Sequence, residues 1–144
     1  MKQPGTITFH FHDTPFRLRQ RREIRTWLHT LAQHHDQRIG ELNYMFCSDA
    51  HMLIMNGQHL DHHYYTDILT FGMPSGQGLA GDILISIDRV RDNAKTHSVS
   101  ALDETHRVMA HGLLHLIGLD DSTPEHKTHM RRAEDHALSI RPFT

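Results

Sequence analysis

The sequence predicts an α+β fold in which a small, twisted mixed sheet packs with helices and a buried helix carries a metal site. Segments with the alternation of strands are interspersed with segments of helical periodicity, without a strict βαβ repeat. The helix expected over 102–117 is apolar on nearly every side, which is typical of a buried helix. At 144 residues the chain is long enough for one domain, 1–144, with a single core.

Each element follows from a local pattern. Alternating residues predict the first strand, and Ile24, Trp27, Leu28 and Leu31 form the core stripe of the first helix. In chain order we expect a strand over 6–11, a helix over 16–37, a strand over 39–48 and a helix over 50–56. Strands over 68–71 and 82–87, joined by the loop 72–78, should follow. The chain should end with helices over 89–97 and 102–117 and a last helix that opens at 122–125 and runs to about 138.

Side chains that accept hydrogen bonds from free backbone amides mark three helix starts. Asp49 and Asp88 are expected to cap the helices that follow them. Ser122-Thr-Pro-Glu125 matches a capping box and should open the last helix.

Composition restricts the class of protein. The net charge is −2, and no run approaches the ~18 apolar residues of a membrane span, so we expect no membrane partner. The N-terminus lacks an apolar signal segment, and Cys47 is the only cysteine, which excludes an intramolecular disulfide and fits a reducing cytoplasm. Any zinc site must therefore use histidine and carboxylate. Most of the 16 histidines are expected on surfaces or loops.

The most informative segment contains His111 and His115. Side chains four residues apart lie on one face of a helix, where two imidazoles can reach one metal ion. Gly118 sits where the helix should stop, so the chain can turn and bring Asp121, or alternatively Asp120, toward the pair. Three protein ligands and an open fourth position are typical of catalytic zinc. The alternative is that both histidines are satisfied by hydrogen bonds in the core.

The residue after His111 decides against one class of hydrolase. Zinc proteases of the His-Glu-x-x-His type place a general base there, whereas this chain has Gly112. The longer protease signature puts its third ligand ten residues after the first, a spacing that favours Asp121 over Asp120.

His111-Gly-Leu-Leu-His115-Leu-Ile-Gly118 resembles the signature of the YbeY-type endoribonucleases. Thr66-Asp-Ile-Leu-Thr-Phe71, Gly81-Asp-Ile-Leu-Ile-Ser86, His106–Ala110 and Met130–Leu138 follow in the order found in that family, so the similarity covers roughly residues 40–138. The resemblance implies a cytoplasmic, zinc-dependent endoribonuclease that acts on single-stranded RNA, in the maturation of the 16S ribosomal RNA 3′ end and in ribosome quality control. It implies one Zn²⁺ per chain and RNA, from ribosomal RNA or the small subunit, as partner, with no DNA expected.

Two positions depart from the family pattern. The family usually ends its motif with Asp-His, whereas this chain has Asp120-Asp121, so a carboxylate would replace the third imidazole. Zinc accepts carboxylate oxygen at about 2.0–2.2 Å, so the site survives the exchange. The family also commonly carries an arginine several residues before its Thr-Asp segment, and Leu60 occupies that place here.

These residues give a working mechanism. Zinc held by His111, His115 and Asp121 would activate water or a ribose 2′-hydroxyl and polarise a phosphate oxygen, with the two histidines as catalytic residues. Asp67 or Asp82 could orient a ligating imidazole, although a structural role as a cap or turn carboxylate is favoured for each.

RNA requires a local basic surface because phosphate contacts dominate affinity. Arg17, Arg21 and Arg25 recur at every fourth position beside the stripe of the first helix and are the favoured RNA-binding cluster. Two other functions compete with the nuclease: a ribosome-associated RNA-binding factor whose metal only stabilises the fold, which Leu60 favours, and a metalloprotease-like hydrolase on another substrate, which Gly112 disfavours.

Overall fold

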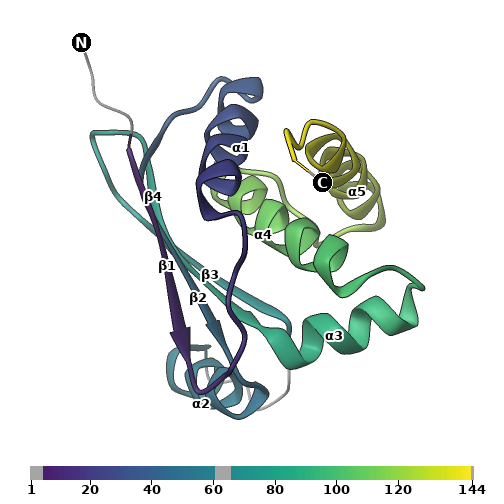
Figure 1. The fold of residues 1–144 in the computed structure, drawn as a ribbon. Coiled ribbons are helices and arrows are strands. Elements are labelled where there is room, and N and C mark those ends of the chain that lie inside the picture. Colours follow the sequence, from purple (N-terminus) through teal and green to yellow (C-terminus); the bar gives the residue numbers. More distant parts are fainter. Residues whose placement is uncertain (1–4, 61–65, 144) are drawn as a thin grey trace.

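The computed structural model describes residues 5–60 and 66–143, without the side chains of 58–60, and within them strands and helices form an α+β fold (Figure 1). In chain order the elements are β1 (Thr6–His12), α1 (Arg21–His34), β2 (Ile39–Cys47), α2 (Asp49–Leu60), β3 (Ile68–Met73), β4 (Leu79–Ser86), α3 (Ile87–Thr96), α4 (Ala101–Ile117) and α5 (Pro124–Ser139). Each lies close to a segment for which the sequence predicts that element. In the described part of the chain, none of the helices is long and apolar enough to cross a membrane.

The four described strands form one mixed sheet in the order β1-β2-β4-β3. β1 and β4 each pair with β2 in parallel, whereas β3 pairs with β4 in the antiparallel direction. The α+β fold and the mixed sheet expected from the sequence are thus confirmed. The order places β1 and β3 at opposite edges of the sheet.

Helices cover one face of the sheet. Leu42, Tyr44 and Phe46 alternate along β2 and are fully buried toward α1 and α4, while α5 lies beyond α4 (Figure 1). The Tyr44 hydroxyl donates a hydrogen bond to the Met109 carbonyl on α4 at 2.8 Å, and Trp27 Nε1 on α1 donates to the Ala137 carbonyl on α5 at 2.8 Å. The first bond fixes α4 to the sheet, and the second ties α1 to α5.

The opposite face has a smaller apolar cluster. Met52 of α2 packs with Leu69 of β3 and Leu84 of β4 on that face. The rest of the described helices lie on the other side of the sheet or at its end (Figure 1).

The predicted start of the first helix at Phe16 is wrong. The described helix begins at Arg21, after Gln20, whose backbone is left-handed with φ 57°. A residue in that conformation cannot continue a right-handed helix. The preceding segment, which contains the buried Leu18, is irregular.

The predicted caps are displaced by one or two residues. Ser48, not Asp49, accepts from an amide in the first turn of α2, and Ser86, not Asp88, caps α3. The two aspartates instead link the two helices: Asp88 accepts from the Asp49 amide at 2.8 Å, and Asp49 accepts from the Ser86 hydroxyl at 2.8 Å.

The last helix also starts one residue late. Thr123 caps α5 by accepting from the His126 amide, whereas the Ser122 hydroxyl donates to Asp120. The predicted capping box is therefore wrong in its N-cap, because the side chain of Ser122 is committed to the preceding turn.

Candidate functional site

The two histidines of the motif lie on α4. Ser100 caps this helix, and Gly118, with φ 124°, ends it by donating its N–H to the Leu114 and His115 carbonyls. His111 and His115 are neighbours on the helix surface, with ring centroids 6.4 Å apart and the rings edge to face. His111 is mostly covered, with 19% of its side chain exposed, whereas His115 is exposed.

Gly112 allows α4 to pack closely on the sheet. A Cβ at this position would lie 2.9 Å from two side-chain carbons of Ile83 and 3.1 Å from Ile68. The glutamate of the His-Glu-x-x-His proteases would therefore point into the sheet here. The close packing of α4 on the sheet therefore explains why this chain has glycine, and not a glutamate base, after His111.

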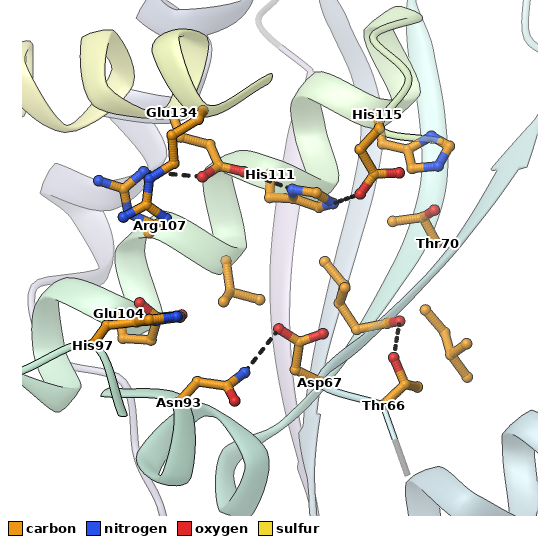
Figure 2. A pocket seen from close by; sticks show the side chains of 15 residues that line it. Thr66, Asp67, Thr70, Asn93, His97, Glu104, Arg107, His111, His115 and Glu134 are labelled. Carbon is orange, nitrogen blue, oxygen red and sulfur yellow. Dashed lines mark hydrogen bonds and ion pairs between the residues drawn. The ribbon is translucent and has the colours of Figure 1, made fainter. Parts of the chain in front are cut away.

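A buried carboxylate orients His111. Glu134 on α5 is 7% exposed, and its Oε2 accepts from His111 Nδ1 at 2.7 Å (Figure 2). An ionised carboxylate only accepts, so in the neutral imidazole Nδ1 carries the proton and Nε2 has the lone pair. Burial lowers the pKa of His111, but the hydrogen bond and charge of Glu134 outweigh burial and raise it overall.

Arg107 holds Glu134 in turn. Its guanidinium donates to Glu134 at 2.9 Å and to Asp135 at 2.6 Å (Figure 2). Burial would lower the pKa of Arg107, but hydrogen bonds to the two carboxylates raise it overall, so the group stays charged. Arg107 and His111 are one turn apart on α4, and Glu134 therefore bridges both from the facing helix.

The turn after α4 separates the two candidate aspartates. The Asp120 carboxylate accepts from the Asp121 amide at 2.7 Å and from the Ser122 hydroxyl at 2.6 Å, so it closes the turn. Asp121 Oδ2 instead lies 3.5 Å from His111 Nε2. Of the pair, only Asp121 faces the free nitrogen of His111.

A cleft of about 580 Å³ opens beside these residues, lined by β3, α3, α4 and α5. Asp67 lies in it and accepts from Asn93 Nδ2 at 3.3 Å (Figure 2). Burial raises the pKa of Asp67, and the nearby His111 only partly opposes the shift. Arg107 and Arg131 also line this cleft, and Lys127 borders a smaller hollow beside Asp121. The site thus combines histidines, carboxylates and cations.

The predicted arginine cluster lies elsewhere. The guanidinium groups of Arg17, Arg21 and Arg25 lie over the rings of Phe11 and Phe9 on β1. The cleft is beside β3, at the other edge of the sheet. The fold therefore does not bring these arginines to the histidines.

The donor types suit zinc, but the described geometry is incomplete. Imidazole and carboxylate are zinc ligands, and an imidazole whose second nitrogen is held by a carboxylate is a common arrangement in zinc sites. His111, with Glu134 behind it and Asp121 in front, fits that pattern. Across residues 5–60 and 66–143, however, no group of three or more His, Cys, Asp or Glu side chains is placed to hold a metal ion.

Sequence reasoning missed Glu134 and Arg107. It considered Asp67 and Asp82 as partners of a histidine, but Asp67 accepts from Asn93, and Asp82 lies on the other face of the sheet and accepts from Asn43. Glu134 could have been noticed as an acid in line with the buried residues of its own helix. Leu60 ends α2, and its side chain lies outside the described residues.

Known proteins resemble this chain over most of its length. The model of the family "Endoribonuclease YbeY" matches residues 7–140. A relative of that name from Cytophaga hutchinsonii is 55% identical over 139 residues, covering 96% of this chain and 97% of the relative. Another from Bacteroides thetaiotaomicron is 43% identical and covers 85% of this chain and 89% of the relative.

A solved structure shares the fold. The solution structure of a Thermotoga maritima protein aligns with a TM-score of 0.63 at 18% identity, covering 91% of this chain and 87% of that one. The architecture and the extent of the sequence matches agree, and the chain belongs to the endoribonuclease YbeY family.

Proposed function

We propose that the chain, as one domain spanning 1–144, is a zinc-dependent endoribonuclease that cleaves RNA in the cleft beside α4. His111, His115 and Asp121 would hold one Zn²⁺. The observation that carries the proposal is the hydrogen bond from His111 Nδ1 to the buried Glu134, which leaves Nε2 facing Asp121. Membership of the endoribonuclease YbeY family supports the reaction class.

The proposed ligand set needs one rearrangement. His111 Nε2 and Asp121 Oδ2 already face each other at 3.5 Å. His115 is exposed and lines the same cleft, so its side chain is free to rotate toward them. Asp120 is the weaker candidate, because its carboxylate closes the turn.

The protein residues have separate roles in this proposal. When bound, zinc would supply Lewis-acid chemistry and lower the pKa of a water molecule. Glu134 keeps the proton of His111 on Nδ1, and Arg107 fixes Glu134. Arg131 and Lys127 stand beside Asp121 and would bind phosphate oxygens of the substrate. Gly112 keeps the helix against the sheet, so no protein carboxylate follows His111 as a base.

The substrate we propose is single-stranded ribosomal RNA, in maturation of the 16S 3′ end and in ribosome quality control. Its support is the family resemblance together with the cations of the cleft. A cytoplasmic location remains a prediction from the sequence.

The test is cleavage of a structured ribosomal RNA fragment by the wild-type chain and by His115→Ala, purified identically. His129→Ala, which removes an exposed histidine of α5 away from the cleft, is the matched control. We expect wild type and His129→Ala to cut the RNA and His115→Ala to be inactive. Equal cleavage by all three would expose a contaminating ribonuclease. If none of them cuts RNA, the non-catalytic RNA-binding alternative replaces the proposal.

A further inference from the structure

We propose that single-stranded RNA also binds a second surface, the β1 arginine strip, formed by Arg17, Arg21 and Arg25 over Phe9 and Phe11. This inference rests on the nuclease function proposed above and extends the RNA contact beyond the cleft. Because β1 and β3 are opposite edges of the sheet, RNA held at both places would have to span at least three strand spacings, about 14 Å.

The strip is the most basic part of the sequence. Residues 17–25 contain five arginines and one glutamate, in a chain whose net charge is −2. Elsewhere Arg89, Arg107 and Arg141 are paired with carboxylates. Within residues 5–60 and 66–143, no arginine of the strip forms an ion pair. The positive charge of the strip is therefore left for an anionic partner.

The guanidinium groups are held in place without being neutralised. Those of Arg17 and Arg21 each lie 5.0 Å from the Phe11 ring centroid, and that of Arg25 lies 4.9 Å from that of Phe9. Arg25 Nε donates to the Ile7 carbonyl at 2.8 Å, and Arg17 Nη1 donates to the Phe16 carbonyl at 2.7 Å. Side chains that are already ordered lose less entropy when a ligand binds.

The spacing of the charges favours an anion. Arg17 and Arg21 each lie 5.0 Å from the centroid of the same Phe11 ring, and no described carboxylate pairs with either of them. A phosphate placed near both would relieve their repulsion and accept several hydrogen bonds, for which guanidinium is well suited.

The shape of the strip favours an extended polyanion. Phe9 and Phe11 are alternate residues of an edge strand, so Arg25 over Phe9 is offset along the strand by about 6.6 Å from Arg17 and Arg21 over Phe11. The side chains of Arg17 and Arg21 are exposed, and a guanidinium plane is a surface on which unpaired bases stack. Single-stranded RNA meets both requirements, charge along a line and flat bases.

The test is a binding titration of the full-length chain. A labelled RNA of about 25 nucleotides exceeds the span of about 4–16 nucleotides typical of single-strand sites, and its fluorescence anisotropy is followed at several salt concentrations. The variant Arg17→Gln/Arg21→Gln/Arg25→Gln is compared with wild type. The control, Arg38→Gln/Arg91→Gln/Lys95→Gln, removes the same charge from exposed residues outside the strip and the cleft.

Loss of three phosphate contacts should reduce the slope of log affinity against log salt by about 2, because each contact contributes about 0.7 for single strands. The control should keep the wild-type slope. An unchanged slope in the strip variant, or the same loss in both variants, would overturn the proposal. If the anionic partner of the strip is an acidic protein, the affinity for RNA will not depend on the strip, and that result would also overturn the proposal.

A second measurement covers the case in which the triple variant fails to fold. An arginine-selective dicarbonyl reagent is applied to wild type with and without RNA, and modified peptides are quantified by mass spectrometry. RNA should protect Arg17, Arg21 and Arg25, and equal modification in both samples would overturn the proposal.

The two proposals can fail separately. A gel checks that the RNA stays intact during each titration, so binding is measured without turnover. If RNA protects the strip of the wild-type chain from modification but is not cut under any metal condition, the proposed RNA-binding strip is supported and the proposed nuclease function is contradicted.

Discussion

Glu134 should control metal affinity through His111. Its side chain is 9% exposed, it accepts from His111 at 2.7 Å, and it accepts from Arg107 at 2.9 Å. Glu134→Gln keeps the shape but removes the charge that fixes the His111 tautomer. Loss of a partner behind a ligating histidine typically costs about 10–100-fold in metal affinity, which is about 1.4–2.7 kcal/mol. We expect a loss of that size for zinc.

The assay is competition for zinc against a chromogenic chelator at constant pH. Asp135→Asn is the matched control, since Asp135 also accepts from Arg107, at 2.6 Å, but does not contact His111. Its side chain is 59% exposed, so its removal should change zinc affinity little. A folded Glu134→Gln that binds zinc as tightly as wild type would refute this account of His111.

Three further variants test packing, protonation and ligand choice. Gly112→Ala should destabilise the fold by up to about 2 kcal/mol in urea unfolding, because overpacking costs about 1–3 kcal/mol and alanine returns roughly 1 kcal/mol in a helix. Gly76→Ala, where a Cβ meets nothing within 4 Å, should be neutral, and equal effects would contradict the packing argument. Burial, aided by a nearby arginine, lowers the pKa of His106 to about 4. Because the pKa of His106 is lower in the folded protein than in the unfolded chain, the stability that neutral His106 contributes is present above about pH 6.5 and is lost as the pH falls to 4. Over that range the free energy of unfolding of wild type should fall by about 3 kcal/mol more than that of His106→Phe. Parallel plots of stability against pH for the two proteins would show the reasoning to be wrong. Asp121→Ala should weaken zinc binding far more than Asp120→Ala, and the reverse order in the chelator assay would make Asp120 the ligand.

The elements could be predicted because their periodicity is local. The sequence predicts a helix over 102–117, and α4 spans Ala101–Ile117. The caps could not be predicted as well, because serines and aspartates compete for the same amides. At α2 and α3 the aspartates satisfy the neighbouring helix, which is a tertiary contact that sequence spacing does not reveal.

The candidate site shows the same limit. The spacing of His111 and His115 and the turn at Gly118 are local, and they indicate the site directly. Glu134 lies 23 residues from His111 and reaches it only because α5 packs on α4. One local signal exists: Glu134 is four residues after the buried Met130, so an acid lies on the apolar stripe of α5.

The measurement that tests the central claim most directly is metal-dependent cleavage. The wild-type chain is stripped with a chelator, assayed on a ribosomal RNA fragment, and assayed again after zinc is added back, with His115→Ala alongside. We predict that stripping abolishes cleavage, that about one equivalent of zinc per chain restores it, and that His115→Ala is not restored. Cleavage that survives stripping, or that zinc restores equally in His115→Ala, would contradict the assignment of the metal to this site.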